Sequence, residues 1–169
     1  MNRQTAEIIT TFFYIGRLHP APGTWGSAAA VVLALALYQA GGAMLLPVAA
    51  LAAALLGFWA VPQALAFTDD PDPASIVIDE VAGQWLALCF TFIPLARHGA
   101  SIFAAWPAFV VPFLLFRLFD IWKPWLVGRA DRRGDAAGVM LDDLWAGLFA
   151  GLVSVMLAGL YHGLVEPRL

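Results

Sequence analysis

Long apolar runs alternate with short polar stretches along this chain. The apolar runs cover residues 27–39, 47–67, 81–93, 99–119 and 144–164. Crossing the hydrocarbon core of a bilayer, which is roughly 30 Å thick, takes about 20 helical residues. The short first and third runs must therefore extend into their flanks, which the apolar stretch 26–46 and a continuation of the third run to Ala96 allow. The pattern predicts an all-α integral membrane bundle with about five transmembrane helices.

The segment before the first run shows a different pattern. Ile8, Ile9, Phe12 and Phe13 would share one face of a helix. A helix with such an apolar face lies in the plane of the membrane interface. We therefore expect an N-terminal interfacial helix ahead of the spans.

Composition supports a membrane protein. Of the 169 residues, 62% are hydrophobic and 12% are charged, whereas a soluble domain carries roughly 25% charged residues. A chain of this length is expected to form one domain, residues 1–169. No basic patch indicates a nucleic-acid partner, so the lipid bilayer is the expected one. Cys89 is the single cysteine, which excludes an intrachain disulfide, and its apolar neighbours indicate a small buried side chain.

If the runs alternate across the membrane, the ionisable residues gather on one side. All of the nine lysines and arginines except Arg97 and Arg168 fall there, together with all of the twelve acids except Glu166. Lysine and arginine in short loops favour the cytoplasmic side, so this side is expected to face the cytoplasm. A simple membrane anchor has no need for so many acids at one face, which indicates chemistry there.

Two similar stretches, IVIDEVAG and VMLDDLWAG, contain the acid pairs Asp79–Glu80 and Asp142–Asp143 at the start of apolar runs. Acids in such places can simply cap a helix, because the helix dipole stabilises them by about 0.3–1 kcal/mol. One cap residue suffices for that purpose, however, and four converging carboxylates repel one another without a cation. Mg²⁺ binds oxygen ligands, commonly a few carboxylates with water and phosphate. The two pairs therefore form a candidate Mg²⁺ site.

A third stretch, FRLFDIWKPW, spaces Arg117, Asp120 and Lys123 three residues apart along one face of a helix end. One interpretation is structural, with an Arg117–Asp120 ion pair and Lys123 reaching toward the membrane surface. The other is an anion clamp, because arginine binds phosphate through two parallel hydrogen bonds and lysine adds a point charge. Asp120 would then orient the arginine or serve as a further metal ligand.

A fourth stretch, GRLHPAPGTWGS, lies at the start of the first apolar run. Its prolines stiffen the chain, and Gly23 and Gly26 let a ligand approach the backbone closely. Thr24 and Ser27 stand at a helix start, where free backbone N–H groups bind phosphate. Thr24 is equally suited to be an ordinary helix cap.

Other residues indicate packing and membrane anchoring rather than chemistry. The last apolar run carries four glycines, Gly147, Gly151, Gly159 and Gly163. Small residues at this helical spacing are typical of close helix packing in membranes. Tryptophans near the ends of apolar runs fit anchoring at the interface, as at Trp25, Trp122 and Trp125.

The stretches GRLHPAPGTWGS, DPASIVIDEVAG, FRLFDIWKPW and MLDDLWAG, in this order, closely resemble the phosphatidylglycerophosphatase A family. The resemblance covers residues 14–155 and implies a small bacterial inner-membrane enzyme that needs Mg²⁺. Such an enzyme removes the terminal phosphate of phosphatidylglycerophosphate and leaves phosphatidylglycerol. The matching residues are Pro22, Gly23, Thr24, Gly26, Asp72, Asp79, Glu80, Gly83, Arg117, Asp120, Lys123, Pro124, Asp142, Asp143 and Gly147. The acids that match no motif, expected to be solvated loop charges, are Asp69, Asp70, Asp131 and Asp135.

Residue chemistry and the resemblance together suggest a role for each side chain. The expected catalytic group is Asp79, Glu80, Asp120, Asp142 and Asp143, and all of these except Asp120 are expected metal ligands. The expected substrate-binding group is Thr24, Arg117, Lys123, Gly23 and Ser27. The phosphate is attacked either by a water molecule that an acid activates or by an acid itself, through an aspartyl-phosphate. The expected partner is the phospholipid substrate in the membrane, made at the cytoplasmic leaflet in bacteria.

Three other functions remain to be weighed. Acids within a membrane also mark cation pathways, but a transporter is expected to place them at mid-span with gates on both sides. A phosphatase for another lipid phosphate monoester has the same chemical needs as the enzyme described above. The His-based lipid phosphatase pattern and the DGxxAR pattern of CDP-alcohol phosphotransferases are both absent from the sequence. A catalytically dead structural subunit has no need to keep every acid and base of the motifs.

Overall fold

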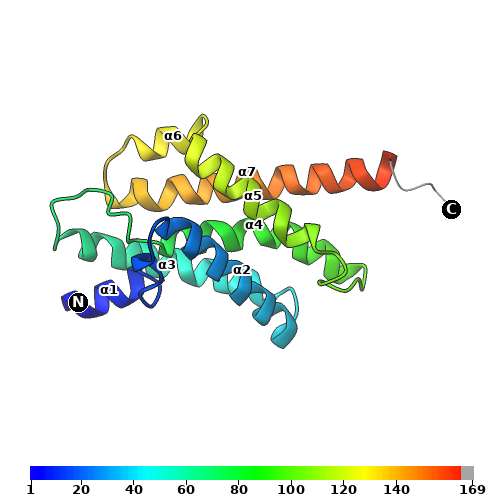
Figure 1. Ribbon diagram of the computed structural model, residues 1–169, viewed down its shortest axis with the longest axis horizontal. Coiled ribbons are helices and arrows are strands. Elements are labelled where there is room, and N and C mark those ends of the chain that lie inside the picture. Colours follow the sequence, from blue (N-terminus) through cyan, green and yellow to red (C-terminus); the bar gives the residue numbers. More distant parts are fainter. Residues whose placement is uncertain (165–169) are drawn as a thin grey trace.

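The computed structural model describes residues 1–164, which form seven α-helices, one short 3-10 helix and, within that range, no β-strand. In chain order the elements are α1 (Arg3–Thr10), η1 (Ile15–Arg17), α2 (Pro22–Gly41), α3 (Leu45–Leu65), α4 (Ile78–Arg97), α5 (Pro107–Trp122), α6 (Leu126–Asp131) and α7 (Ala136–Leu164). They pack as one elongated bundle (Figure 1). The all-α prediction is confirmed, while Glu166 and Arg168 lie outside the described residues.

Four helices, α2, α3, α4 and α7, are long and apolar enough to cross a membrane. The α5 helix has 16 residues, fewer than the about 20 that a full crossing needs. It begins at Pro107 rather than at residue 99, because Gly99 is left-handed (φ 64°) just after α4 and proline favours the first helical position. Each of the five apolar runs thus contains a helix, but the fourth helix is shorter than expected.

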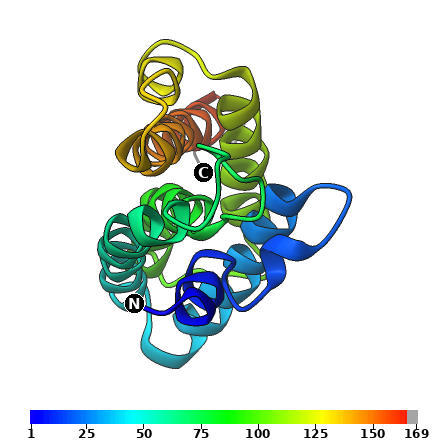
Figure 2. The same cartoon turned by 90° about the vertical axis from the view of Figure 1, so that its left-hand side faces the viewer.

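The α4 helix forms the centre of the bundle. Viewed from the end (Figure 2), α7, α5, α2 and α3 surround it. Its side chains are mostly buried from Ile78 to Phe92, and Cys89 is buried as predicted. Because lipid tails are as apolar as leucine, such packing stabilises a membrane bundle through van der Waals contact and close approach rather than through exclusion of water. Polar side chains that point from this part of α4 into the bundle, such as Gln84, are therefore enclosed by protein.

The chain alternates in direction, so that related helix ends lie together. The starts of α2, α4 and α7 and the ends of α3 and α5 lie toward the left end of the bundle in Figure 1, with the loop 66–77 and α6. The loop 98–106 lies toward the opposite end. The four motif stretches therefore meet at one end, as the alternating topology predicted.

The segment after α1 differs from the prediction. The helix ends before Phe12, and Phe12 and Phe13 both have positive φ values of 46° and 57°. These two side chains therefore do not continue the apolar face of the helix, and that part of the prediction is wrong. Phe12 packs edge-on against Trp85 of α4, with ring centroids 6.3 Å apart, whereas Phe13 is 72% exposed.

The α4 and α7 helices contact each other at a pair of glycines. A Cβ atom at Gly83 would meet the backbone oxygen of Asp143, and one at Gly147 would meet the backbone oxygen of Gly83. Only glycine permits this approach. The close packing predicted for Gly147 is thus confirmed, and it brings the acid-bearing turns of both helices together.

The prediction holds for only part of the glycine run in α7. Gly151 packs against the ring of Phe90, where a Cβ atom would intrude. Around Gly159 and Gly163, no atom of residues 1–164 outside their own helix turn lies within 4 Å of the Cβ position, so the prediction of close packing is wrong there for the described part of the chain. This part of α7 extends beyond the other helices, to the right in Figure 1.

Candidate active site

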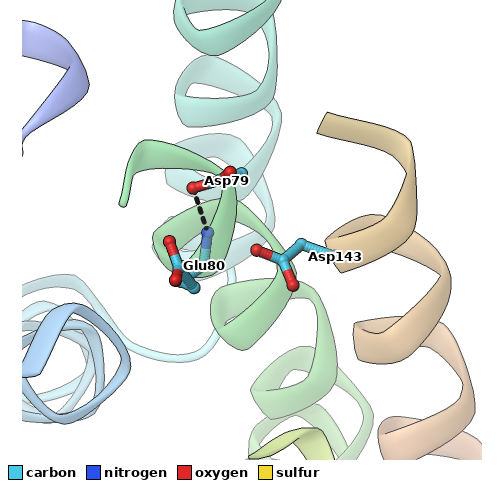
Figure 3. A group of neighbouring side chains, drawn as sticks. All are labelled: Asp79, Glu80 and Asp143. Atoms are coloured by element: carbon cyan, nitrogen blue, oxygen red, sulfur yellow. Dashed lines mark hydrogen bonds between the residues drawn. The ribbon is translucent and has the colours of Figure 1, made fainter. Parts of the chain in front are cut away.

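Three carboxylates converge where α4 and α7 meet. Asp79 and Glu80, the first acid pair, stand in the first turn of α4, and Asp143 reaches toward them from α7 (Figure 3). One carboxylate oxygen from each residue lies within 4.8 Å of the others. Only 5% of Asp79 and 3% of Asp143 is exposed. The structure therefore brings together three of the four expected metal ligands, which we call the acid cluster.

The second acid pair, Asp142 and Asp143, lies inside a helix rather than at its start. The α7 helix begins at Ala136, well before the expected residue 144. Asp135 caps it, because its Oδ1 accepts a hydrogen bond from the Gly138 N–H at 2.7 Å. The helix-cap interpretation is therefore wrong for the second pair. It remains compatible with the first pair, whose position in a first turn suits the helix dipole.

The acid cluster has no cation of its own within the described part of the chain. None of Asp79, Glu80 and Asp143 forms an ion pair there. Oε2 of Glu80 and Oδ1 of Asp143 are buried and accept no hydrogen bond from residues 1–164. Buried carboxylates without partners are costly. A divalent cation that prefers oxygen ligands relieves this cost, so the three side chains fit Mg²⁺.

Asp142 is the expected ligand that lies apart from the acid cluster. Its Oδ2 is 3.0 Å from Nζ of Lys123, which also pairs with Asp131. Lys123 has a left-handed backbone (φ 51°) at the turn that follows α5. Burial favours a lower pKa for Lys123, but hydrogen bonds and charge from Asp131 and Asp142 outweigh it and raise the pKa above its ordinary value. Asp131 therefore belongs to an ion-pair group, and its prediction as a solvated loop charge is wrong.

Arg117 of α5 lies near Glu80, the member of the acid cluster that faces Gly23. Its Nη1 pairs with Asp120 at 2.7 Å and donates to Ser27 Oγ at 3.4 Å. The ion pair of the structural interpretation is thus confirmed, whereas its other part, a Lys123 that reaches toward the membrane surface, is wrong, because Lys123 pairs with Asp131 and Asp142. Nε of Arg117 is nevertheless buried and donates to no acceptor within residues 1–164, which leaves it available to an anion. Asp120 is also close enough to Glu80 to act on it electrostatically.

The start of α2 lies against Glu80 and Arg117. A Cβ atom at Gly23 would meet Oε1 of Glu80 and lie 3.2 Å from Nη1 of Arg117, so a side chain would intrude there. Ser27 is buried one turn later, and its hydroxyl donates to the Gly23 carbonyl oxygen at 2.8 Å. Thr24 lies in the same turn but does not line the neighbouring cavity. Gly23 and Ser27 are therefore at the site, while Thr24 is beside it.

A cavity of about 280 Å³ lies beside this group. It is lined by Ala21, Pro22, Gly23, Asp72, Pro73, Ala74, Ile76, Glu80 and Arg117. The cavity thus connects the start of α2 and the loop before α4 with the acid cluster. An anionic group that enters it meets the guanidinium of Arg117 and lies next to Glu80.

One buried polar side chain near the acid cluster was not recognised from the sequence. Gln84 follows Glu80 by one helical turn on α4, and its side chain is fully buried. Neither of its amide atoms has a hydrogen-bond partner among the described residues. The signal was present, because Gln84 is the one amide side chain in the apolar run 81–93.

Known proteins are similar to this chain over most of its length. The model of the family described as Phosphatidylglycerophosphatase A matches residues 8–158. Phosphatidylglycerophosphatase A of Haemophilus influenzae is 33% identical over 148 residues, which cover 87% of this chain and 85% of that protein. A putative phosphatidylinositol-3-phosphatase of Bacteroides thetaiotaomicron is 35% identical over 152 residues, covering 85% of this chain and 87% of that protein. Phosphatidylglycerophosphatase A of Escherichia coli is 34% identical over 80 residues, covering 47% of this chain and 41% of that protein.

No solved structure matches the chain. The family match spans all four motif stretches, the acid cluster and the cavity beside it. The helices long enough to cross a membrane agree with an enzyme that acts on lipid. This chain therefore belongs to the phosphatidylglycerophosphatase A family, as its four motifs indicated, and is a lipid phosphatase of the membrane.

Proposed function

We propose that this chain hydrolyses phosphatidylglycerophosphate to phosphatidylglycerol and phosphate, with Mg²⁺ as its cofactor. The observation that carries the proposal is the convergence of Asp79, Glu80 and Asp143 beside a cavity lined by Arg117. The substrate is supported by the family and by the Haemophilus influenzae relative, because both descriptions name this activity.

Neutralisation and positioning of the phosphate are the main demands of phosphoryl transfer. Arg117 meets the first demand with its charge and its unpaired Nε, and Asp120 holds the guanidinium in place. Gly23 meets the second, because the absent side chain leaves room beside Glu80 and Arg117. Mg²⁺ held by Asp79, Glu80 and Asp143 would supply further positive charge and lower the pKa of a bound water molecule.

The reaction breaks the phosphorus–oxygen ester bond, joins the oxygen of water to phosphorus and returns a proton to the glycerol oxygen that leaves. A carboxylate of the acid cluster accepts the proton of the attacking water, or attacks first and forms an aspartyl-phosphate. Acid quenching of a brief reaction with radiolabelled substrate distinguishes the two routes. Label that remains covalently attached to the protein supports the aspartyl-phosphate.

We infer that the acid cluster faces the cytoplasm in a bacterial inner membrane. Among the described residues, every lysine and arginine except Arg97 belongs to segments at that end of the bundle. Lysine and arginine in short loops favour the cytoplasmic side. A cysteine placed at exposed Asp70 is therefore expected to react with a thiol reagent only when the reagent reaches the cytoplasmic side.

Hydrolysis of a phosphoinositide is the second candidate function. The Bacteroides thetaiotaomicron relative is called a putative phosphatidylinositol-3-phosphatase and aligns over most of this chain. Both candidate substrates carry a phosphate monoester on a hydroxylated headgroup, so the acid cluster and Arg117 suit either one. The cavity beside them does not by itself decide between glycerol and inositol.

Cation transport has less support. A transporter needs ionisable groups along a path through the membrane, whereas the acid cluster lies near one end of the bundle. The end of α4 farthest from the acid cluster carries Arg97 and His98 but no acid that could continue a cation pathway. Cation flux into liposomes is expected to be absent when the same preparation releases phosphate.

The test is phosphate release by purified protein in detergent micelles. Phosphatidylglycerophosphate and phosphatidylinositol 3-phosphate are compared, each with Mg²⁺ and with EDTA. We expect faster Mg²⁺-dependent release from phosphatidylglycerophosphate, strong loss in Arg117→Ala and full activity in the control Arg97→Ala. Release that persists in EDTA would remove Mg²⁺ from the proposal, and faster release from the phosphoinositide would favour the second candidate.

A further inference from the structure

Gln84 is a buried amide one helical turn from the acid cluster. Its side chain is 0% exposed, and both Nε2 and Oε1 lack a hydrogen-bond partner within residues 1–164. Burying an amide without hydrogen bonds costs free energy, so nearly all such groups in native proteins have a protein, water or ligand partner. Because both amide atoms are unpaired, either orientation of the amide leaves a donor without an acceptor.

A matching acceptor lies one turn earlier on the same helix. Side chains four residues apart share a helix face, with Cβ atoms about 5–6 Å apart, and glutamate and glutamine are both long enough to meet. Oε2 of Glu80 is buried and accepts no hydrogen bond from the described protein. Oε1 of Glu80 has a different environment, beside Gly23 at the cavity. An unpaired donor and an unpaired acceptor therefore occupy neighbouring positions on α4.

We propose that Gln84 is a positioning residue of the metal site. Its Nε2 donates through one bridging water molecule to Oε2 of Glu80 and so fixes the carboxylate for binding the ion. Gln84 itself touches neither the ion nor the substrate. This inference rests on the proposed Mg²⁺ site. Ligating carboxylates are held by such outer partners, and loss of a partner typically weakens metal affinity about 10–100-fold.

The first test measures metal binding without substrate. Mn²⁺, which suits the same carboxylate and water ligands as Mg²⁺, is titrated into purified protein in detergent, and the free ion is measured by electron paramagnetic resonance. Gln84→Met keeps the length of the side chain and removes its hydrogen bonds. We expect the Kd for Mn²⁺ to rise about tenfold or more.

A matched control is available on α3. Gln63 is partly buried in a helix, and its Nε2 donates to the Trp59 backbone oxygen at 2.8 Å. Gln63→Met makes the same chemical change on a helix that carries no member of the acid cluster, and we expect its Kd for Mn²⁺ to equal that of the wild type. An equal rise in both variants would attribute the effect to general loosening of the bundle and overturn the proposal.

Thermal unfolding without metal separates positioning from simple structural support. If Gln84 only braced the helices, Gln84→Met would lower Tm and leave the Kd for Mn²⁺ unchanged. Under the proposal, the substitution also removes the hydrogen bond that fixes Glu80, so the Kd for Mn²⁺ rises whatever the change in Tm in EDTA. The expected result is therefore weaker binding of Mn²⁺, which structural support alone would not produce.

Coupling to Glu80 provides the second test. If Gln84 acts through the Glu80 carboxylate, Gln84→Met changes the Kd for Mn²⁺ little once Glu80→Gln is already present. Additive effects of the two substitutions would overturn the assigned route through Glu80. An unchanged Kd in a folded Gln84→Met protein would overturn the positioning role itself.

A second variant tests the role of Gln84 if Gln84→Met fails to fold. If Gln84→Met does not fold, Gln84→Asn keeps the amide and withdraws it from Glu80 by one methylene group, so its Kd for Mn²⁺ is expected to rise. An unchanged Kd in Gln84→Asn then overturns the role. A wild-type protein that binds no Mn²⁺ would overturn the proposed metal site together with this inference, whereas equal binding by wild type and variant overturns the inference alone.

Discussion

The two acid pairs share a sequence pattern and a local geometry but have different neighbours. In each pair the first aspartate accepts a hydrogen bond from the backbone N–H of the second acid, at 3.0 Å in both cases. The other oxygen of Asp142 lies 3.0 Å from Nζ of Lys123. Asp79 has no ion pair among the described residues and belongs to the acid cluster instead.

The difference shows that a repeated motif need not repeat a role. A lysine from the turn after α5 pairs with the first acid of the second pair, and this acid does not belong to the acid cluster. The second acids, Glu80 and Asp143, both keep one buried oxygen without a hydrogen-bond donor in the described chain. The two pairs therefore offer three side chains to a cation, and the fourth acid belongs to an ion-pair group.

The largest expected effect compares Asp79→Asn with Asp142→Asn. We expect Asp79→Asn to lower Mg²⁺-dependent phosphate release about a thousandfold, the loss typical of removing a group that stabilises transition-state charge. Asp142→Asn is expected to lower it about tenfold, as for an outer partner of a metal site. Both rates are measured in micelles over a range of Mg²⁺ concentrations. Equal losses, with equal loss of Mn²⁺ binding, would show that Asp142 is a ligand and break the comparison.

The next largest effect is expected at Gly83, where α4 contacts α7 between the two acid pairs. Gly83→Ala places a methyl group against the backbone oxygen of Asp143, which pushes α7 away from α4. Displacement of a catalytic group by about 1 Å can cost about a hundredfold in rate, and overpacking costs about 1–3 kcal/mol of stability. Phosphate release and thermal unfolding are measured together. Gly159→Ala is the control, because its Cβ position is open and both quantities are expected to stay near wild type.

A smaller effect is expected at the lysine that distinguishes the pairs. Lys123→Met leaves Asp142 and Asp131 without their shared cation, so Asp142 becomes available to repel the acid cluster or to bind its ion. We expect phosphate release to fall about tenfold and its Mg²⁺ dependence to change. Asp131→Asn is the matched control, since the Lys123–Asp142 pair remains and a single partly exposed partner contributes little. A larger loss in Asp131→Asn than in Lys123→Met would contradict this ranking.

The helical bundle and the end that carries the site could be predicted from the sequence. Apolar runs of membrane length have few stable alternatives to helices, because every backbone polar group must be paired within the segment. Charge at one set of loops then located the site, and the acids and Arg117 were chosen because their chemistry suits a metal and a phosphate. The early start of α7 was missed because Asp142 and Asp143 interrupt the apolar sequence, so the small and apolar residues 136–141 were not counted with the run that begins at residue 144.

The sequence did not predict which acids join the acid cluster and which acid pairs with Lys123. Pairing of Lys123 with Asp142 depends on the left-handed turn at Lys123 and on α6, a short helix within a polar stretch that lacks a clear apolar period. The consequence of burying Gln84 depends on which neighbours leave its amide unpaired. Such pairings are set by three-dimensional contacts between distant segments, whereas the sequence pattern specifies mainly local structure and burial.

Asp135 gives the smallest expected effect and concerns only the helix that carries the second pair. Its carboxylate pairs with Arg133 and accepts a hydrogen bond from Gly138 N–H, and these interactions hold the pKa of Asp135 below its ordinary value. A folded-state pKa below the unfolded value means that the carboxylate stabilises the fold above about pH 3.8. This contribution is lost as the pH falls through the folded-state pKa.

Asp135→Ala is therefore expected to lower Tm slightly at neutral pH and to leave phosphate release unchanged. The difference in Tm between wild type and variant should shrink as the pH falls below about 3.8, because protonation removes from the wild type the same interaction that the substitution removes. Asp70→Ala, at an exposed acid in the loop before α4, is the control. A Tm difference that persists unchanged in acid would mean that Asp135 supports α7 through packing. The start of α7 would then resemble that of α4, which has no side-chain cap, in depending on packing rather than on a carboxylate cap.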